Sequence, residues 1–118
     1  MKVKTSELTG AELDWAVAEA IGGDPILHMT SGTAFVERNG SVFSPSSDWG
    51  QLGEIINTVE IVIGNHPSGE GDNKFWGSAH SFKSGTSFQT WDGAAIAACR
   101  AIVASVHGDE IDLPEGLQ

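Results

Sequence analysis

The sequence has one cysteine, no tyrosine and few basic residues: 6 of its 118 residues are lysine or arginine. A single cysteine cannot form a disulfide within the chain, so we expect a protein of a reducing compartment. The sequence also contains 16 aspartates and glutamates, so its net charge is −10. Direct binding to nucleic acid is not expected, because it depends on lysine and arginine displacing counterions from phosphates. The dispersed negative charge favours a solvated protein surface.

Long hydrophobic runs are also missing. No apolar stretch approaches the roughly 20 residues that a transmembrane helix needs. The first eight residues, Met1–Leu8, contain lysine and glutamate but no apolar centre of the kind that signal peptides carry. We therefore expect a cytoplasmic protein that does not use a membrane as its partner.

The length and an apolar content of 40% are typical of one globular domain. We expect a single α+β domain over residues 1–118, with a mostly antiparallel sheet of about four strands and two main helices packed on it. A glycine-rich, polar stretch predicts a mobile loop over about residues 64–74. The last ten residues, 109–118, form an acidic tail that is expected to dock on the domain.

The first helix is predicted from Gly10 to Ile21. Thr9 and Glu12 have the spacing of a capping box, in which each side chain accepts a hydrogen bond from a backbone amide at the helix start. Apolar residues occupy two opposite sides of this helix, with Leu13 on one and Trp15 on the other. Either the helix is sandwiched between other elements, or Trp15 is exposed.

The second main helix is predicted from Gly93 to His107, and Gly108 ends it. A short helical turn is expected to finish near Ile56. The dipeptide Asn39-Gly40 predicts a type I′ hairpin turn, because both positions of that turn need a positive φ. Alternating and β-branched segments predict strands at Ile26–Thr30, Thr33–Arg38, Ser41–Phe43, Val59–Ile63, Phe75–Phe82 and Thr86–Thr90.

No complete catalytic motif occurs in the chain. The four histidines lack the spacing of metal ligands, and no Gly-x-Ser-x-Gly element is present. The loop Gly64–Asn73 has Glu70 where a phosphate-binding loop has lysine. Cys99 lies beside Arg100 on the apolar stripe of the second helix, where a buried thiol is inert. We therefore expect no catalytic residue, no cofactor and no metal site.

The tryptophans indicate a function more clearly than any catalytic motif does, and the function they indicate is protein binding. Trp15 follows Asp14 and Trp49 follows Asp48, and tryptophan is among the residues most enriched in the anchors of protein interfaces. We take Trp15, Asp14, Trp49, Asp48 and Arg100 as a candidate interaction surface. The alternative is that the tryptophans are core residues at the edges of their elements.

Three blocks of sequence stand out in order: Met1–Ala18, Phe43–Trp49 and Ile96–Glu110. In these blocks the chain resembles the NinX family of lambdoid bacteriophages, a family without an assigned activity. The family's Gly-Gly-Pro is here Leu52-Gly53-Glu54, and its Thr-Pro-Leu before the last helix is Asp92-Gly93-Ala94-Ala95. The resemblance implies a phage or prophage accessory protein that acts in the bacterial cytoplasm.

Three functions remain open from the sequence. The leading hypothesis is a non-enzymatic module that binds a host or phage protein. One alternative is a small metal- or histidine-dependent hydrolase that uses His28, His80 and a carboxylate such as Asp48. The other is an acidic DNA mimic that inhibits a DNA-binding protein, whose binding would depend strongly on salt. The oligomeric state does not follow from the sequence.

Overall fold

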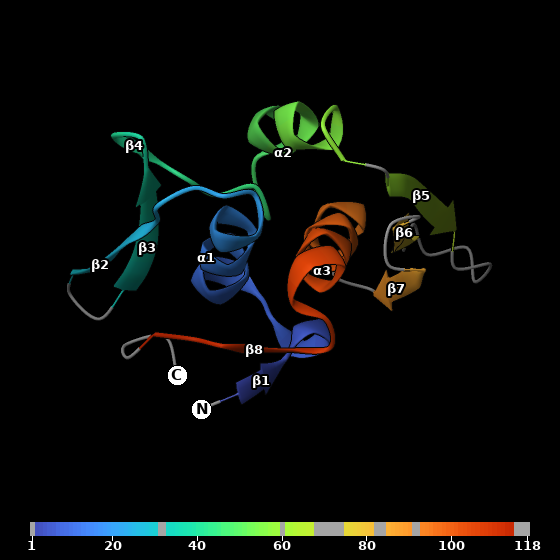
Figure 1. The fold of residues 1–118 in the computed structure, drawn as a ribbon. Coiled ribbons are helices and arrows are strands. Elements are labelled where there is room, and N and C mark those ends of the chain that lie inside the picture. The colour runs from blue at the N-terminus through green and yellow to red at the C-terminus, as the bar shows by residue number, and fades with distance from the viewer. Residues whose placement is uncertain are drawn as a thin grey trace.

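A computed structural model describes residues 2–30, 33–59, 61–67, 75–81, 85–90 and 93–114. Within these residues, three α-helices and three small antiparallel sheets form a mixed α/β globule (Figure 1). The helices are α1 (Gly10–Ala20), α2 (Trp49–Ile56) and α3 (Ala94–His107), and a 3-10 turn, η1, covers Thr5–Glu7. The strands are β1 (Lys2–Lys4), β2 (Ile26–Thr30), β3 (Thr33–Arg38), β4 (Ser41–Val42), β5 (Ile61–Pro67), β6 (Phe75–Ser81), β7 (Thr86–Thr90) and β8 (Glu110–Asp112).

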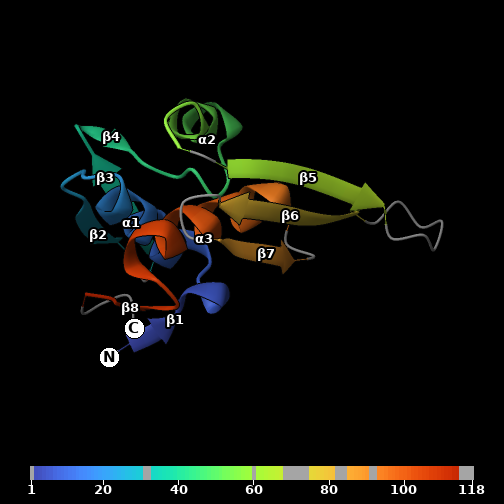
Figure 2. The same cartoon turned by 45° about the vertical axis from the view of Figure 1, so that its right-hand side comes forward.

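Helices α1 and α3 pack side by side at the centre of the molecule, and each carries one sheet on its outer side (Figures 1 and 2). The sheet β2-β3-β4 lies against α1, and the sheet β5-β6-β7 lies against α3. Helix α2 lies over one end of the helix pair, and the β1-β8 ribbon lies at the other. The prediction of one sheet of about four strands was therefore wrong, because the two helices stand between the sheets.

Both central helices are buried on more than one side, which explains this layered arrangement. In α1, Leu13, Val17 and Ala18 are fully buried, and Trp15 packs partly buried against the same core. Every residue of α3 from Ala97 to Ala104 is buried. A helix that is apolar around most of its circumference needs neighbours on several faces. Helix α1 is thus sandwiched, the first of the two alternatives that its sequence left open.

The start of α1 differs from its prediction. Thr9 occupies the N-cap position, but its side chain makes no capping hydrogen bond. Gly10 follows with a φ of 55°, so the chain enters the helix through a left-handed residue and not through the geometry of a capping box. The hairpin between β3 and β4 agrees with its prediction: Asn39 and Gly40 have φ values of 55° and 82°.

The β1-β8 ribbon pairs a short strand near each end of the chain; the acidic tail was expected to dock on the domain, but strand β1 and its pairing were not predicted. Lys2 lies opposite Asp112 and Lys4 lies opposite Glu110 in its register. Thr5 fastens the ribbon to the end of α3, since its hydroxyl donates to the carbonyl of Gly108 at 2.8 Å. Part of the acidic tail is therefore a strand, while residues 115–118 lie outside the described part of the chain.

Strand β5 is longer than predicted and starts later. It begins at Ile61 and continues to Pro67, which pairs with Phe75 of β6. The mobile loop expected from Gly64 onward was thus wrong for residues 64–67, because backbone pairing with β6 does not require apolar side chains. The remainder of that loop, residues 68–74, lies outside the described residues. Among the helices that the structure describes, none combines the length and apolar character needed to cross a membrane.

Candidate interaction surface

Trp49 is the first residue of α2 and is 54% exposed. The helix start is fixed by Asp48, whose Oδ1 accepts hydrogen bonds from the amides of Gly50 at 2.9 Å and Gln51 at 3.3 Å. Leu52, three residues further on, is fully buried and holds the helix on the core. The indole is therefore presented to solvent from a helix end with a defined position.

Trp15 lies in a different setting, on the side of α1 that faces the β1-β8 ribbon. It is partly buried and packs against the hydrophobic core. It also lines a surface hollow of about 360 Å³ together with Lys2, Glu19, His107, Glu110, Ile111 and Asp112. Trp15 thus contributes to packing between helix and ribbon, and no more than part of its ring is open to a partner.

Asp14 and Arg100 are interior residues, each 6% exposed. Oδ1 of Asp14 accepts a hydrogen bond from the amide of Ser46 at 2.9 Å, which ties the segment before α2 to α1. Burial raises the pKa of Asp14, and the hydrogen bond with Ser46 acts in the opposite direction. Nε of Arg100 donates to the carbonyl of Leu8 at 3.0 Å. We therefore leave Asp14 and Arg100 out of the surface available to a partner.

Cys99 is fully buried in α3. Burial raises the pKa of its thiol well above the usual range, and the nearby carboxylate of Asp14 raises it further. The thiolate is the reactive form of cysteine, so this side chain stays protonated and unreactive in the folded protein.

The histidines suggested for a hydrolase lie in different sheets. His28 of β2 forms a 3.0 Å contact between its Nε2 and Oε1 of Glu37 on β3. His80 of β6 forms a 2.6 Å hydrogen bond between its Nδ1 and Oγ of Ser87 on β7. Asp48 is engaged as the cap of α2. In the described part of the chain, no group of three or more His, Cys, Asp or Glu side chains is placed to hold a metal ion.

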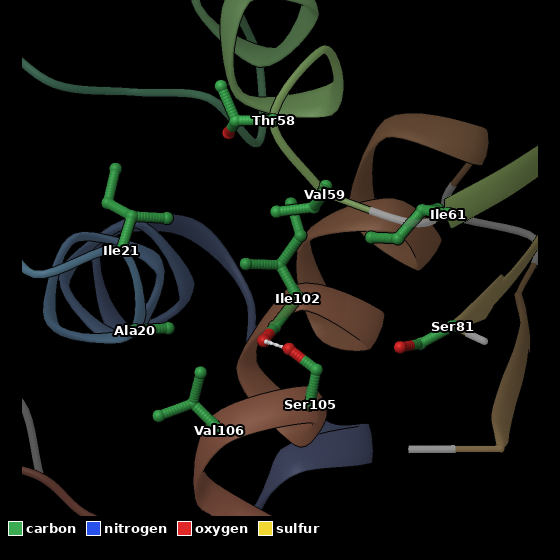
Figure 3. Close-up of a pocket in the computed structure, with 9 residues that line it drawn as sticks. All are labelled: Ala20, Ile21, Thr58, Val59, Ile61, Ser81, Ile102, Ser105 and Val106. Carbon is green, nitrogen blue, oxygen red and sulfur yellow. Dashed lines mark hydrogen bonds between the residues drawn. The ribbon is translucent and has the colours of Figure 1, made fainter. Parts of the chain in front are cut away.

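A hollow of about 470 Å³ opens between α1, α3 and the segment that leads from α2 into β5 (Figure 3). We call it the aliphatic pocket. Its hydroxyls include Thr58, which donates to the carbonyl of Ile55 at 2.8 Å, and Ser105, which donates to that of Ile102 at 2.6 Å. Its described lining holds no titratable group, so the pocket is better suited to binding an apolar side chain than to acid–base catalysis. The lining residues are Ala20, Ile21, Thr58, Val59, Ile61, Ser81, Ile102, Ser105 and Val106.

A second hollow of about 370 Å³ lies between α2 and the β3-β4 hairpin, and we call it the hairpin groove. Arg38 lines it, with the guanidinium carbon 5.4 Å from the ring centre of Phe43. The Nε of Arg38 is buried and has no hydrogen-bond acceptor among the described residues. The other lining residues are Ile21, Ser41, Val42, Gln51, Glu54, Ile55 and Thr58.

A family model described as "Bacteriophage P22, NinX" matches residues 4–106. The chain belongs to the bacteriophage P22 NinX family. The family resemblance noted in the sequence is thereby confirmed over most of the chain. Comparison with curated proteins gives no match.

The matched span of this NinX-family protein includes both candidate tryptophans and Arg38, whereas β8 lies beyond it. Arg38 was missed by the sequence reasoning, which treated it as the last residue of a strand. A signal was available: the Asn39-Gly40 turn places Arg38 opposite Ser41, and Phe43 is two residues beyond Ser41 on the same face, so the hairpin makes the cation and the aromatic ring diagonal neighbours.

Proposed function

We propose that this NinX-family protein is a non-enzymatic phage accessory protein that binds a host or phage protein, with Trp49 as an anchor of the contact. The observation that carries the proposal is the half-exposed indole of Trp49 at the capped start of α2. Tryptophan has a large, rigid ring and only two side-chain torsions to fix on binding, so it contributes contact area at little entropic cost. Asp48 supports this role by fixing the helix end on which the indole stands.

Two features of the described residues favour binding over catalysis. The histidines named for a hydrolase belong to sheets on opposite sides of the helix pair. The aliphatic pocket is lined by aliphatic side chains and by hydroxyls, of which Thr58 and Ser105 donate to backbone carbonyls. A general acid or base must reach the reacting atoms within hydrogen-bond distance, and the described lining of the aliphatic pocket contains no such group.

The proposal is tested by capture of partners from bacteria that produce the phage, followed by mass spectrometry. The bait proteins are the wild type, Trp49→Ala, Trp15→Ala and the control Val62→Ala, whose side chain is 55% exposed on β5. Trp49→Ala should abolish capture of the specific partner and lower the thermal midpoint by only a few degrees. Val62→Ala should capture as the wild type does.

Trp15→Ala should behave differently, because its ring packs on the core. We expect a loss of about 3 kcal/mol in the free energy of unfolding, since replacement of buried tryptophan by alanine costs about 3–5 kcal/mol. Equal capture by Trp49→Ala and the wild type would reject the proposed anchor. Partners that are all lost at 0.5 M salt, independently of Trp49, would instead support the DNA-mimic alternative.

A further inference from the structure

Arg38 is held in a defined position at the end of β3. Its guanidinium group stacks near the ring of Phe43. On another side it lies against the backbone of Gly23, where an added Cβ would collide with Nε and approach Cδ to 3.0 Å. A long, flexible side chain that is confined in this way has already lost much of the conformational freedom that binding would otherwise remove.

The guanidinium of Arg38 has N–H donors without hydrogen-bond acceptors in the described part of the chain. Arginine carries five N–H groups, and among the described residues none of those on Arg38 is paired with an acceptor. Nε is the atom that is fully buried, so the terminal Nη groups are the ones open to the hairpin groove. A fixed cation without an acceptor, in a protein of net charge −10, is suited to an anionic ligand group.

The surroundings favour a carboxylate over a phosphate. Phosphate sites commonly use the free amides at a helix start, but Asp48 already occupies those of Gly50 and Gln51 at the start of α2. Glu54 also lines the groove and opposes a group with more than one negative charge. One guanidinium matches one carboxylate, with two parallel hydrogen bonds.

The backbone of β4 favours a peptide as the carrier of that carboxylate. In a two-residue hairpin, Arg38 and Ser41 exchange backbone hydrogen bonds, so the next pair, Glu37 and Val42, does not. The N–H and carbonyl of Val42 therefore point away from β3. The carbonyl indeed accepts from Nε2 of Gln51 on α2, at 2.9 Å. The N–H of Val42 is directed the same way and suits the carbonyl of an added extended segment.

The hairpin groove also leads into the aliphatic pocket. Ile21 and Thr58 line both hollows, so the two adjoin at these residues. Figure 3 shows Ile21 and Thr58 at one side of the aliphatic pocket, across from Ile61 and Ser81. A segment that places a carboxylate on Arg38 can therefore place a neighbouring apolar side chain in the aliphatic pocket.

We propose that the hairpin groove binds an extended acidic segment of a partner protein. One aspartate or glutamate of that segment pairs with Arg38, and an apolar residue beside it fills the aliphatic pocket. The site is separate from Trp49: Gln51 and Glu54 line the groove, whereas Trp49 is two residues before Gln51 and lies on another side of α2. The two proposals can therefore succeed or fail independently.

The test measures binding by fluorescence polarisation. The probe is a labelled pool of hexapeptides, each with one glutamate and one leucine in a glycine-serine background. A matched pool carries glutamine in place of glutamate. The proteins are the wild type, Arg38→Gln, Gly23→Ala and Lys4→Gln. Gly23→Ala keeps the charge of Arg38 but displaces its side chain, whereas Lys4→Gln removes the same charge from an exposed position on β1.

We expect saturable binding of the glutamate pool to the wild type, and at least about tenfold weaker binding of the glutamine pool, because a charge-assisted pair is lost. Arg38→Gln and Gly23→Ala should each weaken binding of the glutamate pool about tenfold. Lys4→Gln should bind within about twofold of the wild type at the same salt. Glu54→Gln should bind more tightly. Trp49→Ala should bind the pool normally, which separates this site from the proposed anchor.

Several results would overturn the proposal. Equal binding of the glutamate and glutamine pools to the wild type would show that Arg38 does not bind the carboxylate of the peptide. This comparison uses the wild type alone, so it does not depend on whether any variant folds. Unchanged binding in both Arg38→Gln and Gly23→Ala would place the peptide elsewhere. Sodium acetate that binds as tightly as the pool would indicate a small-molecule carboxylate site, and tighter binding of inorganic phosphate would contradict the choice of a carboxylate.

Discussion

The start of α3 comes very close to the backbone of Gly77 in β6. This strand is the middle one of its sheet, and Gly77 pairs with Asn65 on one side and Thr90 on the other. A Cβ placed on Gly77 would overlap the carbonyl carbon of Gly93 and the backbone N and Cα of Ala94, at the start of α3. The missing side chain is therefore what lets α3 approach β6.

Gly77→Ala should be strongly destabilising. All three overlapping atoms belong to the backbone, so relief requires α3 and the sheet to separate, and the paired strands on both sides of β6 resist that shift. Overpacking of a core costs about 1–3 kcal/mol, and backbone obstruction puts this site at the upper end, about 3 kcal/mol. For a domain of this size the thermal midpoint should fall by about 12 °C, at roughly 4 °C per kcal/mol.

The assay is urea unfolding followed by circular dichroism, with thermal melts in parallel. Gly53→Ala is the matched control, because its position in α2 has no atom within 4 Å of an added Cβ. That control should be stabilised by about 0.5–1 kcal/mol, since alanine favours a helix interior over glycine. A free energy of unfolding for Gly77→Ala within 0.5 kcal/mol of the wild type would refute the close contact between α3 and β6.

Three further predictions concern buried polar groups. Asp14→Asn should raise the free energy of unfolding at neutral pH, because the raised pKa of Asp14 means that its ionisation is costlier in the folded state. In urea titrations the gain should decline as the pH falls below the raised pKa of the folded state, and it should vanish below the ordinary aspartate pKa, where Asp14 is protonated in both states. Asparagine keeps an acceptor for the amide of Ser46, so a loss of stability at pH 7 would contradict this. Cys99 should resist iodoacetamide at pH 8 in the native protein and react fully in urea, and rapid native labelling would show that the thiol is accessible. Arg100→Met should cost about 2 kcal/mol, because the buried carbonyl of Leu8 loses its donor; unchanged urea unfolding would contradict that role.

Local signals predicted most of the secondary structure. The strands Ile26–Thr30 and Thr33–Arg38 have their predicted bounds, and α3 begins one residue later than expected. The hydrophobic periodicity, the Asn-Gly turn and the glycines at helix ends each depend on only a few neighbouring residues. Such signals can therefore be recognised in the sequence alone. The β1-β8 ribbon pairs three-residue segments from opposite ends of the chain, and no short-range signal predicts that pairing.

The exposure of the candidate residues was harder to predict from the sequence, because burial depends on packing between distant elements. Trp49 is exposed and Asp48 caps its helix, as an interaction anchor requires. Asp14 and Arg100 are interior residues, since α1 and α3 turn these side chains toward the 44–48 segment and Leu8. The groove at Arg38 is formed where residues of α2 come close to the β3-β4 hairpin, an approach that no local pattern specifies.

Site-specific photocrosslinking tests the central claim of partner binding through Trp49 most directly. A photoreactive benzoylphenylalanine is placed at position 49 and, as a control of equal exposure, at position 62, because Trp49 is 54% and Val62 is 55% exposed. In bacteria producing the phage, position 49 should yield a discrete crosslinked protein that position 62 does not. The absence of any crosslink at position 49, or the same products from both positions, would contradict the account.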